Sequence, residues 1–183
     1  QTDKWGVGTT HDITWNYKGD MTQVQIYYSG NSGSDWWQIA SNQPIGTNHA
    51  GSWPWTIPDD AQHVPCSTSA MIEVQSGAVV DYSELFTVRG SLTLTYPNNS
   101  GITMKVYKTD ADIEQISWTR YGGITNIDLY YSYDNGTSWY PIAGPIGAGT
   151  SPYPWHVPDA IHPQVLVRLW DTTDHDVLDI SEN

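Results

Sequence analysis

Short runs of alternating apolar and polar residues recur along the chain, separated by clusters of Gly, Pro, Asn and Asp. In one such run, Val24, Ile26 and Tyr28 share one parity, whereas Gln25 and Tyr27 take the other. A period of two is typical of a strand with one face in the core and the other in water. The pattern predicts an all-β fold in which antiparallel sheets pack face to face.

The same series of strands and turns occurs twice. Both copies contain an Ile-x-Trp strand, a Tyr-Tyr-Ser segment and a Pro-Trp-x-x-Pro-Asp turn, at residues 13–15 and 116–118, 27–29 and 130–132, and 54–59 and 154–159. The first two pairs are offset by 103 residues and the third by 100. We therefore expect two tandem Ig-like (fibronectin-III-like) antiparallel β-sandwiches, at residues 1–90 and 91–183.

The two ends of the chain are out of phase with this repeat. Repeat 2 opens with the apolar strand Leu92 to Tyr96, and nothing like it precedes Trp5 in repeat 1. Repeat 1 closes with Leu85 to Val88, whereas the sequence stops at Asn183, where that strand would begin in repeat 2. A sandwich without an edge strand exposes apolar core and unpaired backbone. We expect either a piece of a longer repeat array or subunits that complete each other's outer repeats.

A hairpin motif marks both repeats. Residues 132–139 match the Asp-box pattern Ser-x-Asp-x-Gly-x-Ser/Thr-Trp at every position, and residues 29–36 carry Asn31 in place of the Asp. The carboxylate is expected to cap the turn, and Asn-Gly accepts positive φ there. Sialidase propellers carry such boxes, but a six-bladed propeller with about four strands per blade needs a longer chain. The motif therefore predicts a structural hairpin.

The composition narrows the possible functions. The formal charge is −13, from 20 acidic and 7 basic residues, which disfavours nucleic acid and anionic membrane surfaces as partners. No apolar run is long enough to span a membrane, so we expect no membrane insertion. The sequence contains neither a His-Glu-x-x-His nor a Gly-x-Ser-x-Gly motif, and we expect no enzyme activity. The single Cys66 allows no internal disulfide.

An acidic loop near the C-terminus is a candidate calcium site. Its potential oxygen ligands are Asp171, Asp174, Asp176 and Asp179. Calcium prefers oxygen ligands at this density, although the spacing is not that of an EF-hand. The alternative is a solvated acidic turn, and no other cofactor is expected.

Four tryptophans have no tryptophan at the equivalent position of the other repeat: Trp5, Trp37, Trp53 and Trp170. Residues repeated in both copies are expected to build the fold, so these four are the better candidates for contact with glycans or with other subunits. Two sequons, at Asn98 and Asn135, permit N-glycosylation.

The motifs of repeat 2 resemble the Ig-like repeats of bacterial and archaeal cell-surface proteins, and the N-terminal Ig-like domain of the fungal Ser/Thr-rich, GPI-anchored cell-wall family. The shared features are an apolar strand followed by Pro-Asn, the Ile-x-Trp strand, the Tyr-Ser-x-Asp-x-Gly hairpin, a Trp-x-Val-Pro turn and an Asp-x-Ser-Glu ending, here at 94–98, 116–118, 131–136, 155–158 and 179–182. Such repeats are mostly spacers, so the resemblance implies an Ig-like fold and no catalytic residues.

We therefore expect a non-enzymatic, extracellular or cell-surface structural protein: a subunit or repeat segment of a surface layer, filament or adhesin stalk. Its expected partners are copies of itself or neighbouring repeats, which add to its outer strands by β-augmentation. The predicted contact residues lie near the two ends of the chain: Gln1, Trp5, Val7, Val177 and Ile180. The alternative is a carbohydrate-binding module of an adhesin or a secreted enzyme.

Overall fold

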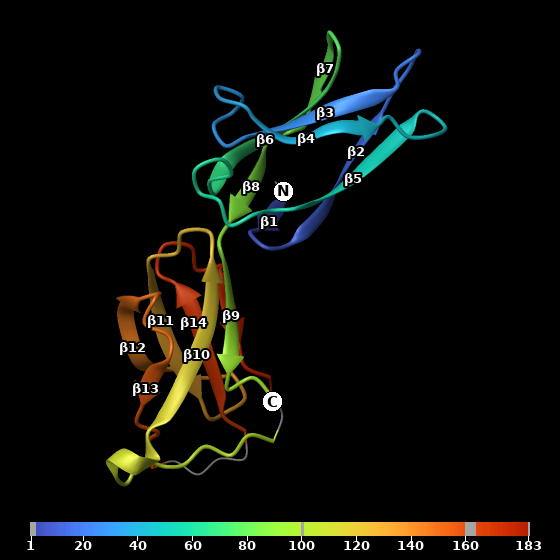
Figure 1. The fold of residues 1–183 in the computed structure, drawn as a ribbon. Helices are drawn as coiled ribbons and strands as arrows, with labels where there is room; N and C mark the ends of the chain where they lie inside the picture. The colour runs from blue at the N-terminus through green and yellow to red at the C-terminus, as the bar shows by residue number, and fades with distance from the viewer. Residues whose placement is uncertain (1–2, 100, 160–163, 183) are drawn as a thin grey trace. The chain divides into compact units, whose positions relative to one another are not determined.

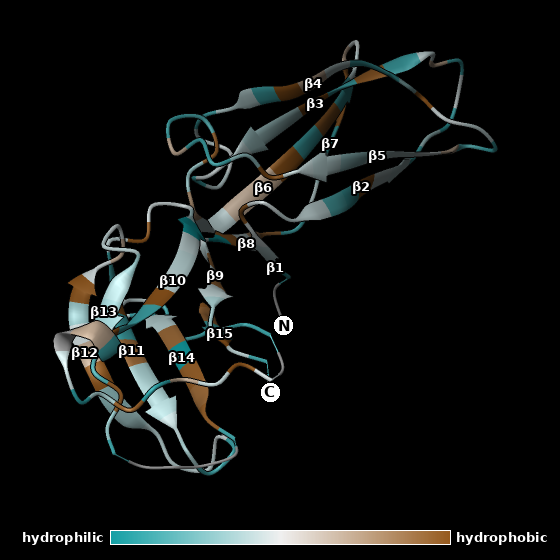
Figure 2. Cartoon of the chain, turned by 60° about the horizontal axis from the view of Figure 1, so that its bottom comes forward, coloured by the Kyte–Doolittle hydropathy of each residue, from teal (hydrophilic) through white to brown (hydrophobic). Residues whose placement is uncertain are grey.

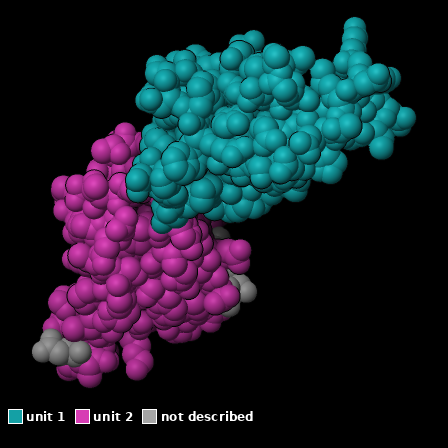
Figure 3. All heavy atoms as spheres, turned by 45° about the horizontal axis from the view of Figure 1, so that its top comes forward, with its two compact units in different colours: residues 1–90 teal, residues 91–183 magenta. Residues whose placement is uncertain are grey.

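The computed structural model describes residues 3–99, 101–159 and 164–182. The chain divides into two compact units, Gln1–Gly90 and Ser91–Asn183, which are coloured separately in Figure 3. The described residues form fifteen strands and one short 3-10 helix, η1 (Asp110–Asp112), so the predicted all-β class is confirmed (Figure 1). Within the same residues, no helix has the length and apolar character needed to cross a bilayer.

Unit 1 contains two sheets. The larger has the order β1-β8-β6-β3-β4 with β7 also paired to β6, and the smaller pairs β2 with β5. The bounds are β1 Lys4–Gly6, β2 Thr10–Asn16, β3 Gln23–Ser29, β4 Trp37–Pro44, β5 Ala50–Thr56, β6 Ser67–Ser76, β7 Val79–Tyr82 and β8 Phe86–Arg89. The pairs are antiparallel, except that β1 runs parallel to β8.

Unit 2 also contains two sheets, with the orders β13-β10-β9 and β12-β11-β14-β15. The bounds are β9 Ser91–Tyr96, β10 Glu114–Tyr121, β11 Asn126–Ser132, β12 Tyr140–Gly147, β13 Tyr153–Trp155, β14 Leu166–Asp171 and β15 Leu178–Ile180. Their pairs are all antiparallel.

Each unit buries one apolar cluster between its two sheets. In unit 1, Ile13 and Trp55 of the small sheet pack in the same cluster as Val24, Ile26 and Tyr28 of the large sheet. The alternation of polar and apolar residues along the strands, visible in Figure 2, places these side chains inside. The inward parity predicted for Val24, Ile26 and Tyr28 is confirmed, because all three are buried.

One tryptophan side chain makes the same hydrogen bond in both units. The indole Nε1 of Trp15 donates to the Ile45 carbonyl at 3.0 Å, and that of Trp118 donates to the Ala148 carbonyl at 2.8 Å. These pairs are separated by the 103-residue offset that aligns the repeats. Trp15 and Trp118 therefore fix an equivalent loop carbonyl in each unit.

The outer ends differ in part from the expectation. Residues Lys4–Gly6, where no opening strand is predicted, form β1, and Trp5 pairs with Val88 of β8. The backbone N–H of Gly8 donates to the Ile57 carbonyl, and in unit 2 the backbone N–H of Tyr107 donates to the equivalent Val157 carbonyl. The segment just before Tyr107 therefore corresponds to β1. That segment is not a strand. Among the described residues of unit 2, no strand equivalent to β8 is present to pair with it.

Candidate functional site: an open groove in unit 1

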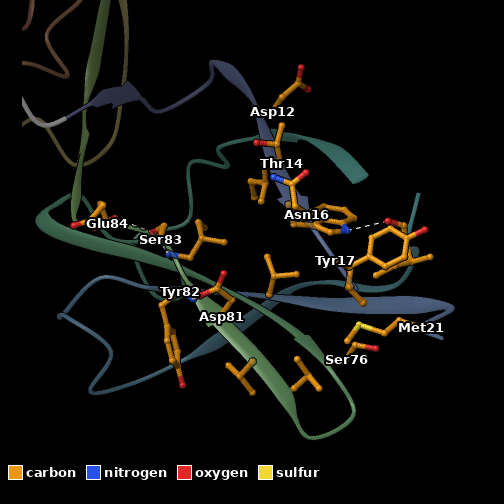
Figure 4. A pocket seen from close by; sticks show the side chains of 18 of the residues that line it. Asp12, Thr14, Asn16, Tyr17, Met21, Ser76, Asp81, Tyr82, Ser83 and Glu84 are labelled. Carbon is orange, nitrogen blue, oxygen red and sulfur yellow. Dashed lines mark hydrogen bonds between the residues drawn. The ribbon is translucent and has the colours of Figure 1, made fainter. Parts of the chain in front are cut away.

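Unit 1 has a groove of about 1130 Å³ between β2 and the β6–β7 hairpin. In Figure 4, Asp12, Thr14 and Asn16 follow β2 along one side, and Asp81 and Tyr82 lie on the opposite side. The groove is therefore lined by β2 of the small sheet and by several strands of the large sheet, β6 and β7 among them.

One edge of β2 faces this groove. Along its other edge β2 pairs with β5, from Thr10 opposite Thr56 to Asn16 opposite Ala50. In unit 2 the equivalent strand β10 has two neighbours, β13 and β9. Within the described part of unit 1, no strand corresponds to β9. The backbone groups on this edge of β2 therefore lack the strand partner that β10 has.

The apolar residues under the groove are incompletely covered. Trp15 and Val74 line it and are half-buried. Their counterparts in unit 2, Trp118 and Leu169, are 4% and 0% exposed. In unit 2, Leu94 of β9 is fully buried in the cluster that contains both counterparts. The exposure of Trp15 and Val74 is therefore explained by the missing strand.

The rim of the groove is also apolar. Val79, Val80, Tyr82 and Leu85 line it and are 36–56% exposed. Contiguous exposed apolar side chains are unusual on an isolated domain and typically mark an interaction surface. Because they adjoin a free strand edge, the surface combines apolar contacts with backbone hydrogen-bonding groups.

One carboxylate of unit 2 shows how this edge is used when it is occupied. Asp179 accepts a hydrogen bond from the backbone N–H of Leu94 in β9 at 2.7 Å, and its other oxygen accepts the N–H of Ile180. The equivalent Asp81 accepts the N–H of Tyr82 in the same way and lines the groove. Among the described residues, its second oxygen accepts no hydrogen bond.

The acidic loop predicted to bind calcium has hydrogen bonds at the carboxylates of Asp171, Asp174 and Asp179. Asp171 accepts hydrogen bonds from Thr173, and Asp174 accepts the backbone N–H of Asp176. Asp179 instead holds β9. Across the described ranges, no three His, Cys, Asp or Glu side chains are grouped closely enough to hold a metal ion. In the part of the chain that the structure describes, these carboxylates organise a turn and a strand contact.

The residues predicted to contact other subunits differ in how exposed they are. Val7 and Val177 are 2% and 5% exposed and belong to the cores of their own units, so their side chains offer little surface to another subunit. Their apolar side chains complete each core instead. Trp5 is half-buried, stacks on His11 with ring centroids 4.4 Å apart and lines one end of the groove. Ile180 is exposed on β15, and Gln1 lies outside the described residues.

Three of the four tryptophans without a counterpart in the other repeat lie in unit 1, and Trp170 lies in unit 2. Trp37 is 48% exposed, stacks on His63 and lines a small pocket together with Trp53. Trp5 lies at the larger groove. Trp170, in unit 2, stacks on His175 and donates its indole N–H to Asp128. Within unit 1, Trp37 and Trp53 line the same pocket.

The Asp-box hairpin holds the geometry predicted for it. Asp134 accepts the backbone N–H of Ser138 at 2.8 Å and the hydroxyl of Ser132 at 2.7 Å, and these bonds lower the pKa of Asp134 to about 2. In unit 1, Asn31 accepts the equivalent bonds from Asp35 and Ser29. The amide therefore replaces the carboxylate without a change in the turn.

The two sequon asparagines differ in accessibility. Asn135 is exposed in the turn with a φ of 55°, whereas Asn98 is half-buried and accepts the backbone N–H of Glu182. Of the two, Asn135 is the more accessible position for a glycan.

The groove is not predicted from the sequence. Its signal is the apolar Gly77-Ala78-Val79-Val80 segment, which stands in repeat 1 where repeat 2 has its acidic loop. Val79 and Val80 of this segment begin β7 and are exposed on the rim of the groove. Comparison of the chain with protein-family models and with curated proteins finds no match.

Proposed function

We propose that the chain is a non-enzymatic structural protein of the extracellular surface, a subunit or repeat segment of a surface layer, filament or adhesin stalk. Both units are proposed to be Ig-like sandwiches. The observation that carries the proposal is the unpaired edge of β2, with Trp15 half-buried under it, at the place where unit 2 holds β9. Open strand edges beside apolar surface promote pairing with another chain, and natural domains usually protect them.

The direct test is the mass of the full chain as a function of concentration, measured by light scattering and electron microscopy. We expect assemblies larger than a monomer. The change Val80→Lys places a charge on the apolar rim and is expected to shift assembly to higher concentration. Ser41→Lys adds the same charge on β4, away from the groove, and is expected to leave assembly unchanged. A chain that stays monomeric at all accessible concentrations contradicts the proposal.

We propose glycan binding as the second candidate function, because one of the unpaired tryptophans offers an open ring. Trp37 shares a pocket of about 360 Å³ with Trp53 and with the His63–Asp60 pair, whose Nδ1 and Oδ2 atoms are 2.7 Å apart. Aromatic rings beside polar groups suit a sugar with one apolar and one hydroxylated face. A glycan array should show binding that Trp37→Ala abolishes and Trp170→Ala retains. Absence of binding to any glycan rejects this candidate.

A further inference from the structure

We propose that the groove of unit 1 binds an extended polypeptide strand of the β9 type, Ser-Leu-Thr-Leu-Thr-Tyr, which adds to β2 as its antiparallel neighbour. This inference rests on the proposed function and names the partner of the open edge: the opening strand of another repeat of this kind. The occupant is inferred from unit 2, where β9 takes the equivalent place beside β10.

The register of the bound strand follows from the repeat. In unit 2, Leu94 lies opposite Trp118 and Thr93 opposite Thr119. With the offset of 103 residues, the second leucine of the incoming strand lies opposite Trp15 in unit 1. The threonines then point outward, as Thr93 does in unit 2.

The apolar side chains of such a strand fit what the groove exposes. In unit 2, Leu92 and Leu94 are 7% and 0% exposed. The corresponding leucines of the incoming strand cover Trp15 and Val74, which the groove leaves half-buried. Apolar area removed from water is the main favourable term in this association.

The polar groups of the groove can also bond to the backbone N–H and C=O groups of the incoming strand. The edge of β2 offers ladder hydrogen bonds, which give affinity in β-augmentation, while alternate side chains give specificity. Asp81 occupies the place of Asp179, which accepts the backbone N–H of Leu94. A carboxylate in this position accepts the N–H of the second leucine in the incoming strand.

A strand of the β8 type does not fit this groove equally well. Unit 1 already contains β8, which pairs with β6 and β1 on the large sheet. The open edge belongs to β2, on the other sheet. In unit 2, the strand that pairs with the equivalent edge of β10 is β9. The groove is therefore specific for an opening strand rather than a closing one.

The test is a titration of the isotope-labelled full chain with a synthetic peptide that has the sequence of residues 89–98, followed by NMR. We expect saturable binding with shifts at Thr14 to Tyr17 and at Val79 to Tyr82. A peptide with aspartate in place of the leucine at position 94 should bind at least about tenfold more weakly. No saturable binding, shifts elsewhere, or equal affinity for the two peptides overturns the proposal.

Two matched variants of the protein test the predicted register. Asp81→Ala should weaken binding of the wild-type peptide by roughly tenfold, because it removes the charged acceptor in the groove. Asp179→Ala makes the same change in unit 2 and should leave peptide affinity unchanged. Equal effects of the two variants on peptide affinity contradict the assignment of the groove.

The peptide also separates this inference from the proposed function. If the chain assembles but neither binds the peptide nor has its assembly inhibited by it, the groove inference fails and the proposed function stands. If the peptide binds in the groove while the chain remains monomeric under every condition, the groove inference stands and the proposed function fails.

Discussion

Strands β2 and β10 have equivalent positions in two copies of one repeat, but within the described residues β10 has a neighbour on both edges and β2 on one. Where β9 covers β10, Trp118 is buried and Asp179 binds a backbone N–H. Where β2 is open, Trp15 is half-buried and the rim of the groove is apolar. The comparison teaches that one strand, β9, accounts for the difference between a sheet that is paired on both edges of its central strand and a sheet that leaves one edge open.

The largest expected effect comes from weakening β9 itself. Leu94→Ala removes a fully buried side chain from unit 2 and should cost about 2–5 kcal/mol of the free energy of unfolding. Urea denaturation should show the transition of unit 2 at lower urea. Thr93→Ala, an exposed change on the same strand, should stay within about 0.5 kcal/mol. A loss below about 1 kcal/mol for Leu94→Ala would mean that β9 does not seal unit 2.

The next effect compares the two equivalent aspartates. Asp179→Ala removes the charged acceptor of the Leu94 N–H and should destabilise unit 2 by about 2 kcal/mol. Asp81→Ala, without a peptide present, should change the stability of unit 1 by less than about 0.5 kcal/mol, because no strand depends on it. Thermal unfolding of both variants measures this difference. Equal losses would show that Asp81 already supports its own unit.

A smaller effect concerns an arginine found only in unit 2. Arg168 lies over the rings of Trp139 and Trp170, with its Cζ 4.2 and 4.4 Å from their centroids. Repeat 1 has Glu73 at the aligned position. Arg168→Ala should cost about 1 kcal/mol of unfolding free energy, whereas Glu73→Ala should cost less. If denaturant curves show no loss for Arg168→Ala, the stacked cation is not stabilising.

The smallest expected effect is a pH dependence of stability that the Asp134 hairpin of unit 2 should show and the Asn31 hairpin of unit 1 should not. The pKa of Asp134 is lowered from 3.8 to about 2 in the folded chain, mainly by the bond from Ser138 N–H. The unfolded chain therefore binds more protons in this range, so the contribution of Asp134 to stability is full above about pH 4 and is lost as the pH falls towards 2. Asn31 does not titrate, so the hairpin of unit 1 should not show this change. NMR titration of the Asp134 carboxyl should give a midpoint near 2, and a midpoint near 3.8 would contradict the account.

The all-β class could be predicted from the sequence, because strands and tight turns depend on short-range patterns of residues. The alternation of residues such as Ile26 and Tyr28, and the Asn-Gly turn at Asn135, directly encode strands and a hairpin. The strand β1 was missed because Lys4–Gly6 is too short for a pattern and depends on its long-range partner β8. Val7 and Val177 were predicted at an interface because their burial is decided by tertiary packing, which the periodicity does not report.

The site was predicted only in outline. The phase shift of the repeat indicates an unfilled strand position, since it needs only a comparison of the two copies. The groove itself needs the long-range approach of β7 to β2, and the role of Asp179 needs the contact with β9, which is 85 residues away in sequence. The spacing of the acidic loop therefore does not reveal that one of its carboxylates, Asp179, bonds to β9.

The most direct test of the open edge is amide hydrogen exchange, compared between β2 and β10. The account predicts that the amides of β2 that do not bond to β5 exchange rapidly in the monomer and become protected on assembly or on binding the peptide of residues 89–98. The equivalent amides of β10 should be protected in both states, because β9 already covers them. If the β2 amides are as protected in the monomer as those of β10, or stay unprotected in the assembly, the central claim is wrong.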